Sequence, residues 1–256
     1  MRLYLVGDTH VGSTACDEQS IERLAATIKA DENALVVGLG DYIEAIAPSD
    51  ARFDPREVGA FVAPEHMNNI FYVEAAYFCK LMELTRGKWA MLIPGNHEDV
   101  AAKQYHTDAA MIIADRLGCP YQGQGEESGW LRIQFCLGLT QKVRDTVDVF
   151  CAHGWGGGET LSTPKYERLT ARKRAQIVAV GHGHKPFSFP YTVEGLDRAG
   201  WEETTQGYFV ECYPMIAKHG YIAKRGGNAP PAGYVVITAE HIERQGTKLG
   251  VELKEL

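Results

Sequence analysis

Short apolar runs alternate with segments of helical periodicity in the first 120 residues. Three of these runs have the length of buried strands, and they cover residues 2–7, 34–40 and 88–96. Between the first two, apolar residues recur at i, i+3, i+4 and i+7 from Ile21 to Ile28, which predicts an amphipathic helix. Two more helices are predicted over 64–84, which a proline opens, and over 107–118, which Gly118 closes. Strands that alternate with helices indicate βαβ units around a parallel sheet.

The second half of the chain has more strand patterns than helical ones. Runs over 129–138 and 146–154 predict two antiparallel neighbours, and a helix near 162–175 precedes a strand that starts at Ile177. Further strand-like segments follow Pro186, separated by glycine and proline, and they lie at 207–217, 233–240 and 248–256.

These elements fit one α/β domain with two packed, mixed sheets flanked by helices. A chain of 256 residues is long enough for one large core, so we expect a single domain over 1–256. In this domain, residues 1–185 carry the motifs described below. Strands within 186–256 are predicted to complete the second sheet.

Polar clusters follow five of the predicted strands. They are Asp8 and His10; Asp41 and Glu44; Asn96, His97, Glu98 and Asp99; His153; and His182 and His184. Each cluster alone is typical of a turn or a helix cap. Ligands of open α/β sheets bind at the carboxyl ends of strands, so five clusters at five such ends favour one shared site.

The ordered motifs "GDTH", "GDYIE", "GNHE", "HGWG" and "GHGH" carry a family resemblance. From Asp8 to His184 they resemble the signature of the calcineurin-like metallophosphoesterases. The resemblance is to small members found in phage and archaeal genomes, often likened to DNA-repair exonucleases. It implies a sandwich of two mixed sheets flanked by helices, with a dinuclear metal site at the carboxyl ends of the strands.

The resemblance also implies which side chains hold each ion. The first ion is assigned to Asp8, His10 and His184, with Asp41 as a bridging carboxylate. The second is assigned to Asn96, His153 and His182. This mixture of imidazole, carboxylate and amide suits first-row ions better than calcium. We expect two divalent ions, manganese first, with iron, zinc, nickel or magnesium as alternatives.

The glycine between the last two histidines of the set has an expected role. A two-residue step lets the rings of His182 and His184 leave one turn in different directions, each toward a different ion. We expect Gly183 to keep a side chain from crowding the bridge between the ions.

Two further residues are assigned to catalysis. In the family pattern, His97 does not bind metal but protonates the leaving oxygen. Several family members carry an acidic residue at the position of Glu44, paired with this histidine. Such a carboxylate would orient the ring of His97 and raise its pKa. The alternative is that Glu44 is a solvated charge at the start of a helix.

Fewer residues of the sequence point to the substrate than to the metal site. Protein Ser/Thr phosphatases of the superfamily carry Asp-Arg after the second motif and arginine after the third. Glu44-Ala45 and Asp99 stand here instead, which disfavours phosphoproteins. Glycine-rich and basic stretches suggest phosphate contacts, and the candidate substrate residues are Lys165, Arg168, Tyr221 and Lys224. A basic helix is also typical of a solvated face.

Composition narrows the classes of function. A net charge of −7 argues against a protein that coats nucleic acid, although a local basic groove is compatible with it. Six cysteines without CxxC spacing suggest reduced thiols, and no apolar run is long enough to cross a membrane. The first residues lack the apolar length of a signal peptide, so we expect a cytoplasmic protein.

Three hypotheses about function follow. The first is a phosphodiesterase or nuclease acting on DNA, RNA or nucleotides. The second is a phosphomonoesterase for small metabolites, and the third is a non-catalytic scaffold, as one retromer subunit with this fold is. A scaffold would be expected to lose ligands or the catalytic histidine. No feature of the sequence marks an oligomer interface.

Overall fold

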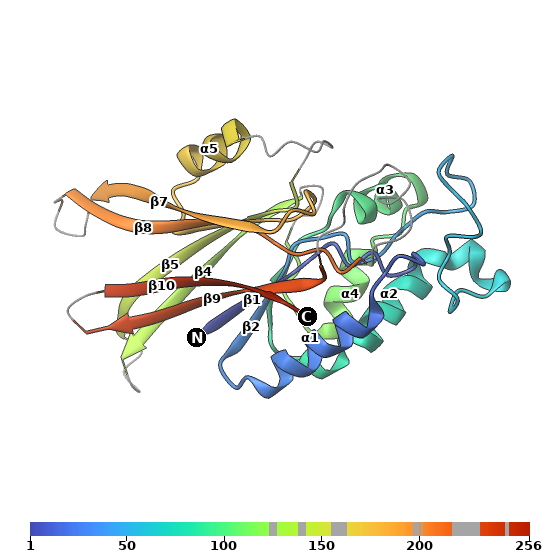
Figure 1. Cartoon of the computed structure of the whole chain (residues 1–256), viewed down its shortest axis with the longest axis horizontal. Coiled ribbons are helices and arrows are strands. Elements are labelled where there is room, and N and C mark those ends of the chain that lie inside the picture. Colours follow the sequence, from blue (N-terminus) through green and yellow to red (C-terminus); the bar gives the residue numbers. More distant parts are fainter. Residues whose placement is uncertain are drawn as a thin grey trace.

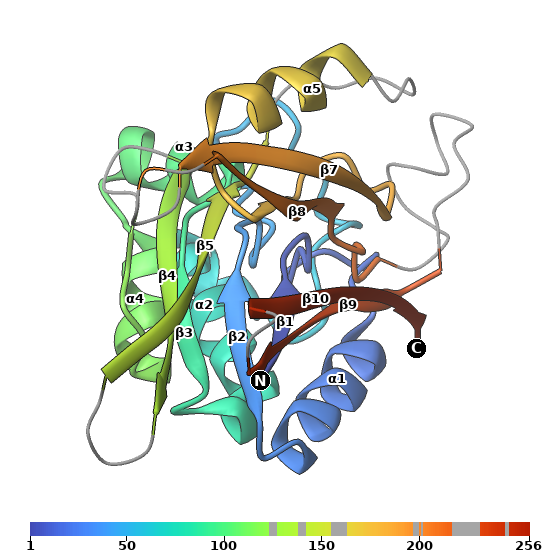
Figure 2. The ribbon, with the colours of Figure 1, turned by 90° about the vertical axis from the view of Figure 1, so that its left-hand side faces the viewer.

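The computed structural model describes residues 1–122, 127–137, 142–154, 163–196, 200, 202–216, 231–243 and 246–256. Two five-stranded sheets pack against each other, and helices cover both outer faces (Figure 1). Figure 2 shows α5 on one outer side and α1, α2 and α4 on the opposite side. The predicted α/β class with two mixed sheets and flanking helices is confirmed.

The first sheet has the strand order β10-β9-β1-β2-β3. Its strands are β1 (Arg2–Val6), β2 (Ala34–Gly38), β3 (Trp89–Leu92), β9 (Gly233–Ile242) and β10 (Gly246–Glu255). The first three strands are parallel to one another, as the βαβ pattern predicts. Strand β9 runs antiparallel to β1 and pairs with it along the side opposite β2.

The second sheet has the strand order β4-β5-β6-β8-β7. Its strands are β4 (Ser128–Leu137), β5 (Lys142–Ala152), β6 (Ile177–Val180), β7 (Phe187–Leu196) and β8 (Glu202–Glu211). Strands β5, β6 and β8 are parallel, and β4 and β7 are antiparallel edge strands. The predicted antiparallel pairing of the two runs before residue 155 is confirmed.

The helices lie where the periodicity places them, with two exceptions. They are α1 (Glu18–Ala30), α2 (Ile70–Leu81), α3 (Asn96–Tyr105), α4 (Ala109–Leu117) and α5 (Thr163–Arg172). The sequence reading did not foresee α3, because the polar motif at its start was read as a loop. The predicted continuous helix over 64–84 is wrong, since two 3₁₀ segments (Pro64–Asn69 and Glu83–Thr85) flank α2.

The strands after residue 186 need a second correction. Strands β7 and β8 complete the second sheet, but β9 and β10 belong to the first. An apolar pattern marks a segment as a strand without saying which sheet it joins, because that depends on pairing with residues far away in the chain. The sequence did not predict β7, in which the exposed residues Pro190, Thr192 and Glu194 alternate with partly buried ones.

Three apolar layers alternate with the sheets. Successive residues of a strand point to opposite faces, so Leu3 and Leu5 face the second sheet while Tyr4 and Val6 face the helices. A third layer packs α5 against the outer face of the second sheet through Tyr166 and its neighbours. Within the described residues, no helix is long and apolar enough to cross a membrane.

Candidate metal centre

The predicted ligands converge because their strands end at the same edge. Asp8 and His10 follow β1, Asp41 follows β2, and Asn96 follows β3. His153 follows β5 in the second sheet, while His182 and His184 follow β6. All these strands are parallel within their own sheet, so their carboxyl ends share one end of the sandwich.

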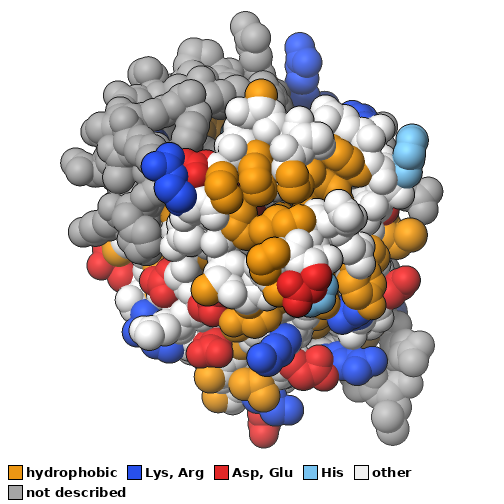
Figure 3. All heavy atoms as spheres, turned by 90° about the vertical axis from the view of Figure 1, so that its right-hand side faces the viewer, with side chains coloured by type: hydrophobic (Ala, Val, Ile, Leu, Met, Phe, Trp, Pro, Cys, Tyr) orange, Lys and Arg blue, Asp and Glu red, His pale blue; other side chains and the backbone are white. Residues whose placement is uncertain are grey.

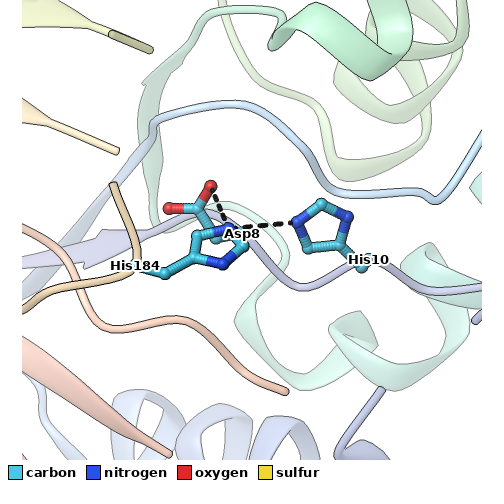
Figure 4. A group of neighbouring side chains, drawn as sticks. All are labelled: Asp8, His10 and His184. Atoms are coloured by element: carbon cyan, nitrogen blue, oxygen red, sulfur yellow. Dashed lines mark hydrogen bonds and ion pairs between the residues drawn. The ribbon is translucent and has the colours of Figure 1, made fainter. Parts of the chain in front are cut away.

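The first group consists of Asp8, His10 and His184, whose potential ligand atoms lie within 4.8 Å of one another. Figure 4 shows the three side chains pointing toward a common centre. His184 Nε2 lies 3.3 Å from His10 Nε2 and 3.4 Å from Asp8 Oδ1. Two nitrogens bound to one tetrahedral ion at about 2.0–2.1 Å lie roughly 3.3 Å apart, so the spacing fits a shared cation.

The second group consists of Asp41, His153 and His182, within the same 4.8 Å limit. His153 Nε2 lies 3.1 Å from Asp41 Oδ2 and 3.3 Å from His182 Nδ1. The amide oxygen of Asn96 lies 3.1 Å from the same His153 nitrogen, so it can join the group. The donors therefore match the mixed imidazole, carboxylate and amide set of a first-row ion.

Asp41 connects the two groups. Its Oδ2 atom lies 3.9 Å from His10 Nε2 and 4.0 Å from His97 Nε2, and these three residues form a third group of potential ligand atoms. A carboxylate shared by neighbouring donor sets is what a pair of adjacent ions requires. The two buried His/Asp clusters are thus consistent with a dinuclear site.

The backbone at the ligands is unusual. Seven described residues other than glycine have positive φ, and five of them are predicted ligands, namely Asp8, His10, Asp41, His182 and His184. Such conformations are costly for residues with a side chain, and Asp and His tolerate them better than most. They cluster at functional sites, where the surrounding structure holds them in place.

Hydrogen bonds to the far ring nitrogens turn two of the histidines toward the centre. Nδ1 of His153 donates to the carbonyl of Leu39 at 2.7 Å, which leaves Nε2 facing the second group. Nδ1 of His10 lies 3.0 Å from Oε2 of Glu44. Partners of this kind fix the tautomer and orientation of imidazoles that bind metal.

The carboxylates and imidazoles of the centre shift one another's pKa values in opposite directions. Burial would raise the pKa of Asp41, but the neighbouring imidazoles hold that pKa well below its usual value. Burial would likewise lower the pKa of His153, yet the charge of Asp41 raises it to about 10. The centre therefore holds carboxylates beside a protonated imidazole, and a cation that binds there replaces a proton.

Glu44 contacts the site differently from the prediction. Its carboxylate bonds to His10, whereas His97 Nδ1 donates to the main-chain carbonyl of Glu44. The expected carboxylate contact with His97 is therefore not formed. The alternative of a solvated helix-start charge is wrong too, because Glu44 is half-buried and lies in no helix. Burial lowers the pKa of His97, but the charges of Asp41 and Glu44 outweigh this and raise it.

Glu98 supports the ligand turns of the first sheet. Its buried carboxylate accepts hydrogen bonds from the backbone N–H groups of Asp41 at 2.9 Å, Ile43 at 3.0 Å and Gly95 at 2.8 Å. The turn after β2 and the start of α3 are thereby held against each other. The sequence analysis noted Glu98 within its motif but gave it no role.

Glu211, at the end of β8, supports the turn that carries His182 and His184. The buried carboxylate accepts from the backbone N–H of Lys185 at 3.2 Å and from the hydroxyl of Tyr166 at 2.7 Å. A Cβ atom at Gly183 would lie 2.0 Å from Oε1 of Glu211. The glycine therefore makes room for this carboxylate, rather than for the bridge between ions as predicted.

The next residue, Cys212, touches a ligand directly. Its buried Sγ lies 3.3 Å from Oδ2 of Asp8, whose carboxylate also accepts from the backbone N–H of His182 at 3.0 Å. The sequence reading missed both Glu211 and Cys212. Their only signal is a single acid inside the apolar run "YFVECY" at 208–213.

A cavity of about 230 Å³ opens on the centre. Seven of its lining residues belong to the motifs, namely His10, Asp41, Glu44, Asn96, His97, His182 and His184. Tyr221 and Lys224, two of the predicted substrate residues, lie outside the described residues. The side chains of Lys165 and Arg168, on α5, are likewise outside them, so all four remain predictions.

One comparison with known proteins identifies a family. A family model described as calcineurin-like phosphoesterase matches residues 1–186. No curated protein sequence matches the chain significantly.

Solved structures are similar only at a distance. Vps29 of Entamoeba histolytica complexed with zinc is 10% identical, with a TM-score of 0.44 and 99% of each chain covered. A predicted phosphoesterase of Streptococcus pneumoniae is 12% identical, with a TM-score of 0.39 and coverage of 98% of this chain and 97% of that one. Haemophilus influenzae NAD nucleotidase is 9% identical, with a TM-score of 0.45 and coverage of 99% of this chain and 50% of that one.

Proposed function

Because the chain belongs to the calcineurin-like phosphoesterase family, we propose that it hydrolyses phosphodiesters in nucleic acids or nucleotides. The observation that carries the proposal is the convergence of seven donor side chains on two adjacent, buried groups beside His97. The resemblance of the motifs to small phage and archaeal members supports a diester substrate. A phosphomonoesterase acting on small metabolites is the alternative.

Seven residues would hold a pair of divalent ions, with manganese as the expected metal. Asp8, His10 and His184 would take one ion and Asn96, His153 and His182 the other, with Asp41 shared. When bound, the ions supply Lewis-acid chemistry that polarises the phosphoryl group and makes hydroxide available near neutral pH.

His97 is proposed to protonate the leaving oxygen. Its Nδ1 donates to the carbonyl of Glu44, so Nε2 is the atom that faces the cavity. The raised pKa of His97 favours the protonated ring, which a general acid needs. Glu44 contributes by fixing that ring through its carbonyl and by turning His10 through its carboxylate.

Recognition of the substrate is proposed to occur in the cavity, not over a broad basic surface. On the face shown in Figure 3, the coloured basic side chains are interspersed with acidic ones around a largely apolar area. Such a face does not attract nucleic acid by charge alone. A non-catalytic scaffold is disfavoured, since the full donor set and His97 are present.

One panel of assays tests the proposal. The purified protein is incubated with Mn²⁺ and a chromogenic phosphomonoester, the matching diester, and labelled single- and double-stranded DNA. Cleavage of the diester and of DNA supports the proposal. Cleavage of the monoester alone overturns it in favour of the phosphomonoesterase, and no cleavage of any substrate by protein that holds two ions favours the scaffold.

Substitution of His97 tests the general acid. His97→Ala is expected to keep both ions but to lower turnover by about 10²–10⁴-fold. The control is His66→Ala, because His66 is exposed in the 3₁₀ segment before α2. Full activity of the His97 variant would rule out the assignment.

Substitution of Glu44 separates its two contacts. Glu44→Gln leaves the carbonyl in place for His97 but weakens the charge beside His10. We expect weaker binding of one ion, by about 10–100-fold. We also expect the alkaline limb of the pH–rate curve to move to lower pH, because the charge of Glu44 raises the pKa of the general acid His97. An unchanged metal affinity together with an unchanged pH profile would remove Glu44 from the mechanism.

A further inference from the structure

The outer wall of the cavity is a long connection that the motifs do not include. Residues 45–63 link the turn after β2 to the 3₁₀ segment before α2, and Ile46, Arg52 and Glu57 from this stretch line the cavity. The connection, which we call the wall segment, contains neither helix nor strand.

The wall segment is fastened at both sides of the cavity. The hydroxyl groups of Ser49 and Tyr105 lie 2.7 Å apart, which ties the segment to α3 and so to the helix that begins with Asn96 and His97. On the other side, Thr14 N–H donates to the carbonyl of Glu57 at 2.9 Å. The residues of the segment that line the cavity are thus held in fixed positions.

Arg52 is the one lysine or arginine among the described residues that line this cavity. Asp50 fixes its guanidinium, since the carboxylate accepts from Nε at 3.1 Å and from Nη2 at 2.8 Å. Hydrogen bonds from Arg52 lower the pKa of Asp50, and the charge of His97 lowers it further. Arg52 lines the same cavity as His97, the residue proposed to protonate the leaving group.

A second Asp–Arg pair with the same kind of hydrogen bonds follows four residues later in the chain. In "DARFDPRE", Asp54 accepts from Nε of Arg56 at 2.9 Å and from Nη2 at 2.7 Å, as Asp50 does from Arg52. The Arg56 side chain is 86% exposed and does not line the cavity, whereas that of Arg52 is 51% exposed. Each arginine is hydrogen-bonded to the aspartate two residues before it, and the two arginines differ in their access to the cavity.

We propose that Arg52 binds a second phosphate of the substrate, the one that follows the scissile phosphate on the leaving-group side of an oligonucleotide. This inference rests on the proposed function and names its substrate class. A guanidinium held by a carboxylate is pre-oriented for phosphate oxygens and pairs with them more directionally than lysine does. Glu57 lines the same cavity, and Arg52 is the lining residue that offers a guanidinium to a phosphate.

A comparison of two arginine variants tests the proposal by activity. Wild type, Arg52→Ala and Arg56→Ala are assayed with Mn²⁺ on an eight-nucleotide single strand and on bis(p-nitrophenyl) phosphate, which has one phosphate. Arg52→Ala is expected to lower kcat/KM on the oligonucleotide about 10-fold more than on the small diester, mainly through KM. Arg56→Ala is expected to leave both values at the wild-type level, and Arg52→Lys is expected to fall between.

Equilibrium binding tests the same contact without catalysis. The affinity of the full chain for the labelled oligonucleotide is measured against salt concentration in the presence of EDTA. Loss of one phosphate contact should reduce the slope of log K against log salt by about 0.7 in Arg52→Ala, and not in Arg56→Ala.

The outcomes separate this inference from the proposed function. If the small diester is cleaved but Arg52→Ala binds and cleaves the oligonucleotide like wild type, the role of Arg52 is wrong and the hydrolase stands. Equal effects of Arg52→Ala and Arg56→Ala on cleavage and binding of the oligonucleotide would also overturn the role of Arg52. If no ester is cleaved but Arg52→Ala alone loses affinity and salt slope, the subsite stands and the proposed function fails.

Discussion

The two halves of the metal centre are built alike but from different parts of the chain. In the first sheet, Glu98 holds the turn of Asp41 by accepting backbone N–H groups. In the second, Glu211 does the same for the turn of His182 and His184. In each half, a buried carboxylate that is not itself a predicted ligand fixes the backbone of the ligands.

The halves differ in the sequence separation between the supporting carboxylate and the predicted ligands whose backbone it fixes. Glu98 is two residues from Asn96 and accepts three backbone N–H groups. Glu211 comes from the strand beside β6, 27 residues after His184, and shares its carboxylate with the hydroxyl of Tyr166. The first half is therefore supported from within its motif, and the second depends on tertiary contacts with β8 and α5.

The largest effect on hydrolysis is expected from substitution of Asp41, which lies between the two halves of the centre. Asp41 lies near donors of both groups, so Asp41→Asn should weaken both ions, whereas His182→Ala should weaken mainly one. We expect the Asp41 variant to lose about 10³-fold or more in hydrolysis, since ion-based charge stabilisation is worth several kcal/mol. Elemental analysis after gel filtration checks the metal content. Two ions per chain in Asp41→Asn would contradict the shared role.

The next largest effect is expected on stability, when the carboxylate of Glu98 or of Glu211 is removed. Glu98→Ala leaves three buried backbone N–H groups without an acceptor, at about 1–3 kcal/mol each, so a loss of about 3–9 kcal/mol is expected. Among the described contacts, Glu211→Ala leaves the backbone N–H of Lys185 and the hydroxyl of Tyr166 without this acceptor, which should cost about 2–6 kcal/mol. Urea denaturation of the metal-free proteins measures both values. A larger loss for Glu211→Ala would reverse the comparison.

Substitution of Gly95 and of Gly183 is expected to distinguish the two halves further. A Cβ at Gly95 would lie 2.3 Å from the backbone nitrogen of Asp41, which cannot move aside, whereas a Cβ at Gly183 meets only the end of the Glu211 side chain. Overpacking at Gly183→Ala should cost about 1–3 kcal/mol, and Gly95→Ala more.

Shortening Glu211 is expected to relieve the clash at Gly183. In a double-mutant cycle, Gly183→Ala should cost less in the Glu211→Asp background than in wild type, which denaturation measures. Additive losses would show that the carboxylate is not what excludes a side chain there.

The smallest effect is expected at Cys212. Its thiol is a weak donor to Asp8, so Cys212→Ala should cost about 1 kcal/mol in stability and change hydrolysis only a few-fold. Denaturation and steady-state rates measure the two quantities. Loss of an ion in this variant would contradict this small effect and would show that the thiol helps Asp8 to bind metal.

The contrast between the halves also explains what the sequence could predict. Asp8, Asp41 and Asn96 were identifiable because each follows an apolar run of strand length, and such ends meet at one edge of a parallel sheet. His153 and His182 follow the same rule in the second sheet. Local pattern and sheet geometry suffice for these positions.

Contacts set by tertiary structure were not predictable in this way. Glu211 and Arg52 lie outside every motif, and their roles depend on which segments pack beside them. The pairing of β9 with β1 depends in the same way on residues more than 200 positions apart. The contact of His97 with a carbonyl, rather than with the carboxylate of Glu44, depends on side-chain orientation that spacing does not determine.

The pairing of β1 with β9 has a consequence for biosynthesis. Strand β1, which leads into Asp8 and His10, lies between β2 and β9, but β9 leaves the ribosome about 230 residues later. At about 5–20 residues per second, β1 therefore has an open hydrogen-bonding edge for roughly 10–50 s. An unpaired edge favours association with other chains. The first ligands to be synthesised therefore directly follow the strand whose second partner is synthesised last.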